Sequence, residues 1–220
     1  MVPEMTDYLK RAGRFFLILG SVPPLIGFIA AWFAGLGFIL VLFGFPAAAL
    51  ILIVGSIVFA VRGIRLARAM DGGWRDKLLV GFATPIMLAI TVAIALPLLR
   101  TGSYIGTWTR LFVNLAHYER IIAAAQRERG NGSYSEFRDD HGVTYIVDYG
   151  PPVRVAFNPE GMLDNWSGII YDPSHQVELA KGFDPVSGKF YAPERVTKIF
   201  GGDLVACRRL YGDYYDCSFT

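Results

Sequence analysis

The chain has 220 residues, of which 53% are hydrophobic, and its formal net charge is +2 at pH 7. So small a net charge, with no basic stripe interleaved with aromatic residues, excludes nucleic acid as an expected partner. Almost all of the charge lies at the N-terminus, between two apolar runs, or after Arg100. This change in composition predicts a domain boundary near residue 100.

Two long runs of sequence contain no ionisable residue. Residues 15–61 pass without Asp, Glu, Lys, Arg or His, and so do residues 78–99. A buried helix of a soluble protein is usually shorter and has a polar face, so these runs predict a membrane protein. One helix over the first run would be about twice as long as a bilayer core is thick. The run is therefore expected to reverse at residues 34–37, where Gly35 and Gly37 tolerate turn dihedrals.

This reversal predicts a membrane α-helical region with three transmembrane helices at about 15–33, 38–61 and 78–99. Residues 1–14 would form a cytoplasmic tail, residues 62–77 a cytoplasmic loop, and residues 101–220 an extracytoplasmic domain. Two spans with a re-entrant hairpin are the main alternative. The expected partner of residues 15–100 is the lipid bilayer.

The cations predict the orientation of these spans. Lys10, Arg11 and Arg14 precede the first span, and the segment after the second carries several more cations, whereas the expected reversal carries none. Positive residues are retained in the cytoplasm, so the N-terminus is expected inside and the C-terminal domain outside. Spaced three apart, the arginines of residues 62–68 either bind anionic lipid headgroups or act only as topology determinants. The cations of this segment are Arg62, Arg65, Arg68, Arg75 and Lys77.

Small residues recur every four positions within the expected spans, as helix-packing seams do. The alternative is that Gly and Ala are simply common in membrane helices. Because the spans carry no ionisable residue, they lack the groups that proton relays and most ion pathways need. They are therefore expected to be an anchor or an assembly surface. The residues of the two stripes are Gly27, Ala31 and Gly35 in the first span, and Gly81, Ala89 and Ala93 in the third.

The C-terminal part predicts a small α+β domain with one helix on an antiparallel sheet. Residues 104–129 have the apolar period of an amphipathic helix, with Thr107 as its N-cap. Residues 143–149, 153–157 and 166–171 alternate as strands do. Residues 193–200 predict a short helix that begins at a proline, and residues 204–220 predict a hairpin.

The expected hairpin contains the only two cysteines, Cys207 and Cys217, whose midpoint is Gly212. A symmetric three-residue loop at residues 211–213 would place the cysteines directly opposite each other, where a disulfide is geometrically reasonable. Disulfides persist in oxidising compartments, which agrees with the orientation inferred from the cations. A zinc site would need more ligands, and a redox pair usually has closer spacing.

Candidate chemistry is sparse in this domain. If their loops met, Asp139, Asp140, His141, Asp172 and His175 would provide metal ligands or acid–base groups. Such loops are more often solvated turns, and His117 is expected at a partly exposed helix surface. The sequence predicts neither a metal site nor a cofactor. The aromatic residues near the C-terminus are read either as an exposed recognition patch or as core: Tyr211, Tyr214, Tyr215 and Phe219.

Several stretches resemble segments of uncharacterised proteobacterial membrane proteins with a C-terminal periplasmic domain. These are residues 155–157 (VAF), 163–174 (LDNWSGIIYDPS), 200–207 (FGGDLVAC) and 214–220 (YYDCSFT). The resemblance covers about the last seventy residues. It implies a bacterial inner-membrane setting with a periplasmic domain, and carries no activity and no site.

These observations favour a non-enzymatic function. The chain is predicted to be a membrane-anchored periplasmic interaction or accessory module, with a protein partner in the periplasm or the membrane. One alternative is a small subunit of a larger envelope, transport or respiratory complex. Another is a periplasmic hydrolase or metal-dependent enzyme that uses the Asp and His loops, which requires Asp140, His141, Asp172 and His175 to share one pocket.

Overall fold

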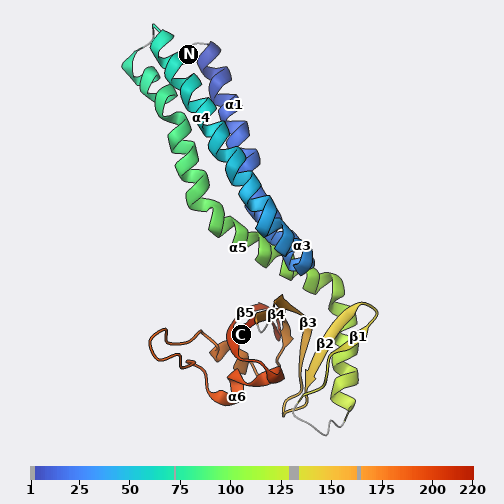
Figure 1. Cartoon of the computed structure of the whole chain (residues 1–220). Helices are drawn as coiled ribbons and strands as arrows, with labels where there is room; N and C mark the ends of the chain where they lie inside the picture. The colour runs from blue at the N-terminus through green and yellow to red at the C-terminus, as the bar shows by residue number, and fades with distance from the viewer. Residues whose placement is uncertain (1–2, 72, 129–133, 163–164) are drawn as a thin grey trace. The chain divides into compact units, whose positions relative to one another are not determined.

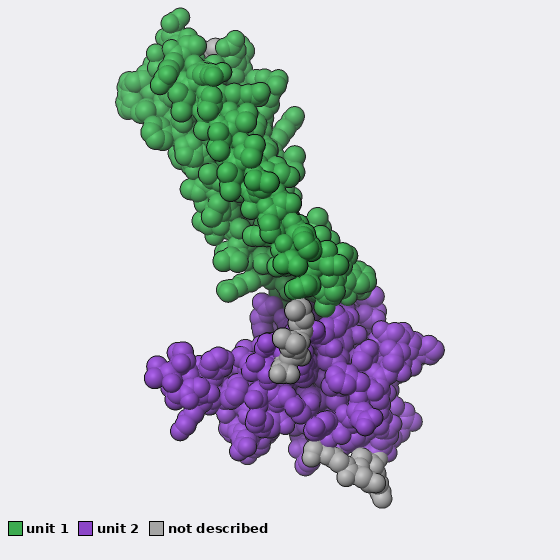
Figure 2. All heavy atoms as spheres, viewed as in Figure 1, with its two compact units in different colours: residues 1–106 green, residues 107–220 purple. Residues whose placement is uncertain are grey.

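The computed structural model describes residues 3–71, 73–128, 134–162 and 165–220. They fall into two compact units, residues 1–106 and 107–220 (Figure 2). The first unit is helical and the second contains the sheet (Figure 1). Each unit has a buried apolar cluster of its own.

The helical unit consists of apolar helices that follow one another with short breaks. They are α1 (Pro3–Gly20), α2 (Val22–Trp32), α3 (Ala34–Ile39), a π-helical turn (Leu40–Gly44), α4 (Phe45–Ala69) and the first part of α5 (Trp74–Arg127). Pro23 and Pro24 lie in the first turn of α2. Backbone N–H groups of the first turn have no acceptor within the helix, so proline, which lacks an N–H, is tolerated there. Among the described residues, three helical stretches are long and apolar enough to cross a membrane: Pro3–Trp32, Ala34–Ala69 and Trp74–Arg127.

The chain reverses one residue earlier than expected. Phe33 has the extended dihedrals φ −140° and ψ 86° and separates α2 from α3. Residues 34–37 are already helical, so the prediction of a turn at residues 34–37 is wrong. The glycines serve a different purpose here. A Cβ on Gly37 would lie 2.4 Å from the Cβ of Ala30, so glycine lets α3 approach α2 closely. Close approach, rather than turn dihedrals, explains this glycine.

The helices also extend beyond the expected borders. Residues 3–14 belong to α1, and α4 continues through Ala69, so residues 62–69 of the expected cytoplasmic segment are helical. The expected separate helix at 104–129 with Thr107 as N-cap is wrong, because α5 runs without interruption to Arg127. Gly102 lies inside α5 and packs closely against α2. A Cβ at this position would lie 2.0 Å from the carbonyl oxygen of Pro24, so glycine lets the two helices approach each other.

In the described part of the second unit, six strands form one antiparallel sheet in the order β1-β2-β3-β4-β6-β5. This confirms the expected antiparallel sheet, although the edge strand β1 was not expected. Successive side chains of a strand point to opposite faces, so the strands contribute apolar side chains to both covered faces of the sheet. The strands are β1 (Arg138–Asp140), β2 (Val143–Asp148), β3 (Arg154–Met162), β4 (Asn165–Tyr171), β5 (Leu204–Tyr211) and β6 (Tyr214–Phe219).

The hairpin of β5 and β6 holds the expected disulfide. Cys207 and Cys217 are register partners, their Cα atoms are 4.2 Å apart, and a disulfide joins them. The loop contains two residues rather than three, because Tyr211 pairs with Tyr214. Gly212, at the first loop position, has φ +53°, which glycine adopts readily.

The sheet lies between two layers. On one face, residues of α5 within the second unit pack through Leu111, Tyr118 and Ile122, which are buried. Tyr118 stacks on Phe157 at a centroid distance of 4.1 Å, and its hydroxyl oxygen accepts a hydrogen bond of 2.7 Å from Asn158 Nδ2. The other face is covered by the segment between β4 and β5. That segment contains the 3₁₀ turns Gln176–Leu179 and Ile199–Gly201 and the short helix α6 (Glu194–Thr197).

Candidate functional site

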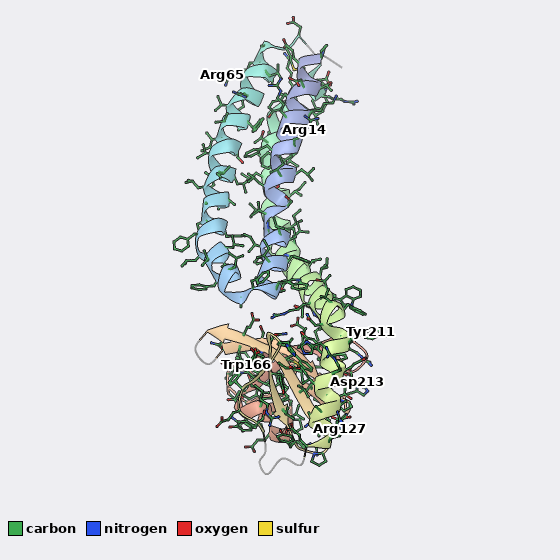
Figure 3. All side chains as sticks on the ribbon, turned by 90° about the vertical axis from the view of Figure 1, so that its right-hand side faces the viewer. Arg14, Arg65, Arg127, Trp166, Tyr211 and Asp213 are labelled. Carbon is green, nitrogen blue, oxygen red and sulfur yellow. A yellow bond between two sulfur atoms is a disulfide. The ribbon has the colours of Figure 1, made fainter. Side chains whose placement is uncertain are left out.

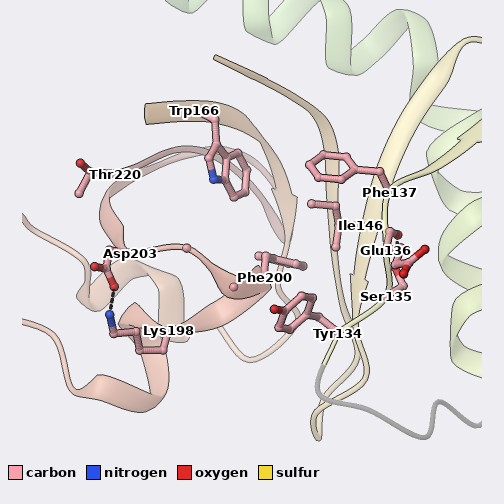
Figure 4. A pocket seen from close by; sticks show the side chains of 12 residues that line it. Tyr134, Ser135, Glu136, Phe137, Ile146, Trp166, Lys198, Phe200, Asp203 and Thr220 are labelled. Carbon is pink, nitrogen blue, oxygen red and sulfur yellow. Dashed lines mark hydrogen bonds and ion pairs between the residues drawn. The ribbon is translucent and has the colours of Figure 1, made fainter. Parts of the chain in front are cut away.

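A pocket of 880 Å³ opens on the sheet domain (Figure 4). Its walls come from the segment before β1, from β2 and β4, and from the turn between α6 and β5. Four aromatic side chains line it: Tyr134, Phe137, Trp166 and Phe200. We call this pocket the aromatic groove. Concave apolar surface with a few polar groups is typical of binding sites.

Trp166 forms one wall of the groove and is held from behind. It lies on β4 opposite Phe219 of β6, and the two rings stack at 3.7 Å with an interplanar angle of 3°. Trp166 also lines a neighbouring pocket of 570 Å³, so the two pockets meet at the indole. Stacking on Phe219 fixes the orientation of the ring, which lines both pockets.

Tyr134 and Phe137 form the opposite rim and are exposed, at 53% and 68%. The segment that carries them is fixed to β2, because Ser135 N donates to Val147 O at 2.7 Å and Val147 N donates to Ser135 Oγ at 2.9 Å. Gly201, with φ +73°, makes room for Tyr134, since a Cβ there would lie 2.8 Å from the phenol ring. The rim is therefore a fixed extended segment with two exposed aromatic residues.

The charged groups of the groove lie at its two sides. Lys198 forms an ion pair with Asp203 at one side, and Glu136 is exposed at the other. Among the described lining residues there is no Cys or His, and the Ser135 hydroxyl is occupied, because it donates to Glu136 O at 2.8 Å. The arrangement offers an apolar floor with charges of both signs at its edges.

A buried ion cluster lies at the end of the sheet where β2 ends and β3 begins. Arg154 donates to Asp172 at 3.0 Å through Nε and to Asp148 at 3.2 Å through Nη1, and the Asp172 side chain is fully buried. Burial opposes ionisation of Asp172. Hydrogen bonds from Ser174 and Val177 N–H, together with the Arg154 charge, outweigh burial and lower the pKa of this carboxyl. The cluster ties β2 and β3 to the segment that follows β4.

The structure places the predicted Asp and His residues in two separate places. Asp140 ends β1, whereas Asp172 follows β4, three strands away, or about 14 Å at ordinary strand spacing. The register also puts them toward opposite ends of the sheet. Within the described residues, no group of three or more His, Cys, Asp or Glu side chains is arranged to hold a metal ion. The enzyme alternative required one shared pocket, and these residues do not form it.

Each of these groups has a local partner instead. Asp140 lies 2.9 Å from Nε2 of His117, and this hydrogen bond is the main reason that the pKa of Asp140 is lowered. His117 is partly exposed, as expected, with a side-chain exposure of 15%. His141 is exposed and lies 3.7 Å from Asp140, and Asp139 accepts a hydrogen bond from Gly142 N at 3.2 Å, closing the turn.

His175 belongs to a second group around the buried Tyr215. Its Nδ1 lies 2.6 Å from the Tyr215 hydroxyl, which donates to Glu178 at 2.9 Å. Burial and the Glu178 carboxylate raise the pKa of Tyr215. Of the four C-terminal aromatic residues, Tyr214, Tyr215 and Phe219 are buried, and Tyr211 is 54% exposed. The interpretation as core residues is therefore confirmed for Tyr214, Tyr215 and Phe219.

The small-residue stripes of the helical unit divide into two sets. A Cβ on Gly27 would lie 2.2 Å from the Leu99 carbonyl oxygen, and Ala31 lies against Gly106, so these residues pack within the unit. A Cβ on Gly35 or on Gly81 would meet nothing within 4 Å. Ala89 and Ala93 are exposed, as are Arg62, Arg65 and Arg68.

The aromatic groove was not predicted from the sequence, although one signal was present. Tyr134 and Phe137 lie in an otherwise polar stretch between the long helix and β2. Aromatic residues in such a stretch indicate exposure rather than core. The contribution of Trp166 and Phe200 depends on tertiary contacts and has no local signal.

Comparisons of this chain with protein-family models, with curated proteins and with solved structures found no match.

Proposed function

We propose that the chain is a membrane-anchored binding module whose sheet domain presents the aromatic groove to a protein partner. The observation that carries this proposal is the groove itself, with Tyr134 and Phe137 exposed at its rim and Trp166 fixed by Phe219. Aromatic residues dominate the energetics of protein interfaces, because they bury large area at small entropic cost. A rim of fixed backbone adds little ordering cost on binding.

The proposed setting is the bacterial inner membrane, with three spans, the N-terminus in the cytoplasm and the sheet domain in the periplasm. Three apolar helical stretches support this count. The cations at residues 10–14 and 62–77 support the orientation. The disulfide between Cys207 and Cys217 supports an oxidising compartment for the sheet domain.

Photocrosslinking in intact cells tests the binding function. A benzoylphenylalanine at Phe137 should give a discrete adduct with one partner, whereas the same group at Val186, which is 93% exposed, should not. Adding Trp166→Ala to the Phe137 crosslinker variant should weaken the adduct. Equal labelling from both positions, or no adduct from Phe137, would contradict a partner at the groove.

Alkaline-phosphatase fusions test the proposed topology separately. A fusion after Phe219 should be active, and a fusion between the end of α4 and the start of α5 should be inactive. The reverse pattern would overturn the compartment of the sheet domain, whatever binds to its groove.

A second candidate is a small subunit of a larger membrane complex. It is favoured by the outward position of Gly81, Ala89 and Ala93, since small residues allow another helix to approach closely. Stoichiometric partners that co-purify in mild detergent, and are lost on Ala89→Leu, would support it. A clean monomer would count against it.

A further inference from the structure

Three helix ends meet at one end of the helical unit. Tyr8 of α1 joins them, because its hydroxyl lies 2.8 Å from Thr84 Oγ1 of α5 and donates to Phe59 O of α4 at 3.2 Å. Tyr8 also belongs to a buried cluster with Met70 and Val80. The start of α1, the end of α4 and the start of α5 are therefore packed together at this end.

This end carries a concentration of cations. Arg62, Arg65 and Arg68 lie on the last turns of α4, and Arg75 and Lys77 lie on the first turn of α5. Four of these five are exposed, and Lys77 is half-buried. Within the described residues, none of the five forms an ion pair with a carboxylate.

Helix α1 adds three more cations at the same end. Arg11 pairs with Asp7 at 2.8 Å, whereas Lys10 and Arg14 are exposed and have no acidic partner in the part of the chain described. Arg14 and Arg65 both lie toward this end (Figure 3). Eight cations thus stand against four carboxylates between residues 3 and 77, which are Glu4, Asp7, Asp71 and Asp76.

The residues next to these cations are of the kinds that proteins place at a membrane surface. Trp74 is 68% exposed, and the Arg75 guanidinium lies 5.6 Å from its ring centroid. Exposed Leu78 and Leu79 follow directly on α5. Tryptophan beside cations and next to an apolar helix surface is typical of the boundary between headgroups and hydrocarbon. Arginine suits phosphate because its guanidinium donates two parallel hydrogen bonds.

We propose that this basic end binds the phosphate groups of anionic phospholipids, with Arg62, Arg65 and Arg68 at the centre of the site. The inference rests on the proposed membrane placement and is independent of the aromatic groove. A cation near an anionic membrane surface contributes about fivefold in affinity, so removing three should weaken binding by up to about 100-fold.

The test measures lipid binding by the full-length chain in a zwitterionic detergent. Phosphatidylglycerol is titrated, and bound lipid is counted by native mass spectrometry, with phosphatidylcholine as the neutral reference. The test variant is R62Q/R65Q/R68Q. The matched control removes three exposed cations of the sheet domain, K181Q/K189Q/R195Q. Because binding is measured in detergent, a change in topology in cells does not affect the result.

The proposal expects the native chain and the control to retain phosphatidylglycerol in preference to phosphatidylcholine, and the test variant to lose that preference. Equal retention by the test variant and the control would overturn it and leave the arginines as topology determinants. Displacement of the lipid by an equal concentration of inorganic phosphate would also overturn it, because the site would then bind free phosphate as well as a lipid headgroup.

Discussion

Several hydroxyl groups along the helical unit bond to their own helix, those of Tyr8 and Thr84 being exceptions, whereas several polar side chains of the sheet domain join segments far apart in the sequence. Ser56 donates to Leu52 O and Thr91 donates to Met87 O, both one turn back. By contrast, Asn158 reaches Tyr118, and Arg154 reaches Asp172. Local bonds satisfy a hydroxyl at little cost in organisation. Distant bonds specify a tertiary structure, because both partners must be brought together.

The surfaces of the two regions differ in the same sense. Leu17 and Phe43 of the helical unit are 74% and 66% exposed, while the sheet domain covers Phe157 and Ile170 completely. A water-soluble protein does not usually expose so much contiguous apolar surface. Under the proposed placement, lipid covers this surface. The sheet domain is therefore expected to depend on internal contacts, and the helical unit on helix packing and its surroundings.

The largest effect is expected from the buried ion cluster. Arg154→Ala leaves Asp148 and Asp172 buried without their cation, which should reduce the stability of the sheet domain by about 3–5 kcal/mol. Urea unfolding of the full chain in detergent, followed by near-ultraviolet circular dichroism, measures this loss. Arg195→Ala, at an exposed position, is the control. A loss no larger than that of the control would show that the cluster does not support the domain.

Removing the disulfide should have the next largest effect. It joins residues ten apart in sequence, so Cys207→Ser with Cys217→Ser should cost about 2–3 kcal/mol by releasing the unfolded chain. The unfolding transition of the sheet domain should shift, and the helical signal of the first unit should not. Reduction of the native chain should reproduce the shift. Helical and sheet signals shifting together would contradict separate stability of the two regions.

A pair of glycine variants tests packing in the helical unit. Gly27→Ala places a Cβ 2.2 Å from the Leu99 carbonyl oxygen and should cost about 1–3 kcal/mol. Gly81→Ala meets nothing within 4 Å and should stabilise its helix by up to about 1 kcal/mol. Thermal unfolding in one detergent, followed by far-ultraviolet circular dichroism, compares them. Equal effects would mean that close approach at Gly27 contributes little.

Acid should distinguish the two regions more subtly. The pKa of Asp172 is lower in the folded domain than its ordinary value of about 3.9, so the unfolded chain takes up a proton first as the pH falls. The stability that Asp172 provides is present above about pH 4 and is lost as the pH falls further. Urea midpoints of the sheet domain between about pH 2 and pH 7 measure this loss. Asp172→Asn should make the domain less stable and should weaken the dependence of its urea midpoint on pH. An unchanged dependence on pH would show that other carboxyl groups cause it.

Local pattern was sufficient for much of the fold. The uncharged runs predicted long apolar helices, and period-two alternation predicted β2 and β4 almost to the residue. The disulfide was predicted from the equal spacing of Cys207 and Cys217 about Gly212, but the loop has two residues, and the two cysteines oppose each other because the register shifts between Arg209 and Tyr211. The continuity of α5 did not follow, since Gly102 and Gly106 signal a break locally and are helical through contacts with α2.

The sequence alone therefore determined the division into apolar helices and an antiparallel sheet domain, and the cysteine pairing. These properties depend on composition, period and short-range geometry. Only the tertiary structure decided which polar groups meet. It placed Asp140 with His117 and Asp172 with Arg154, and it built the aromatic groove from Tyr134, Trp166 and Phe200. The physical reason is that these contacts cross between strands and layers, so they depend on the register and packing of the whole domain.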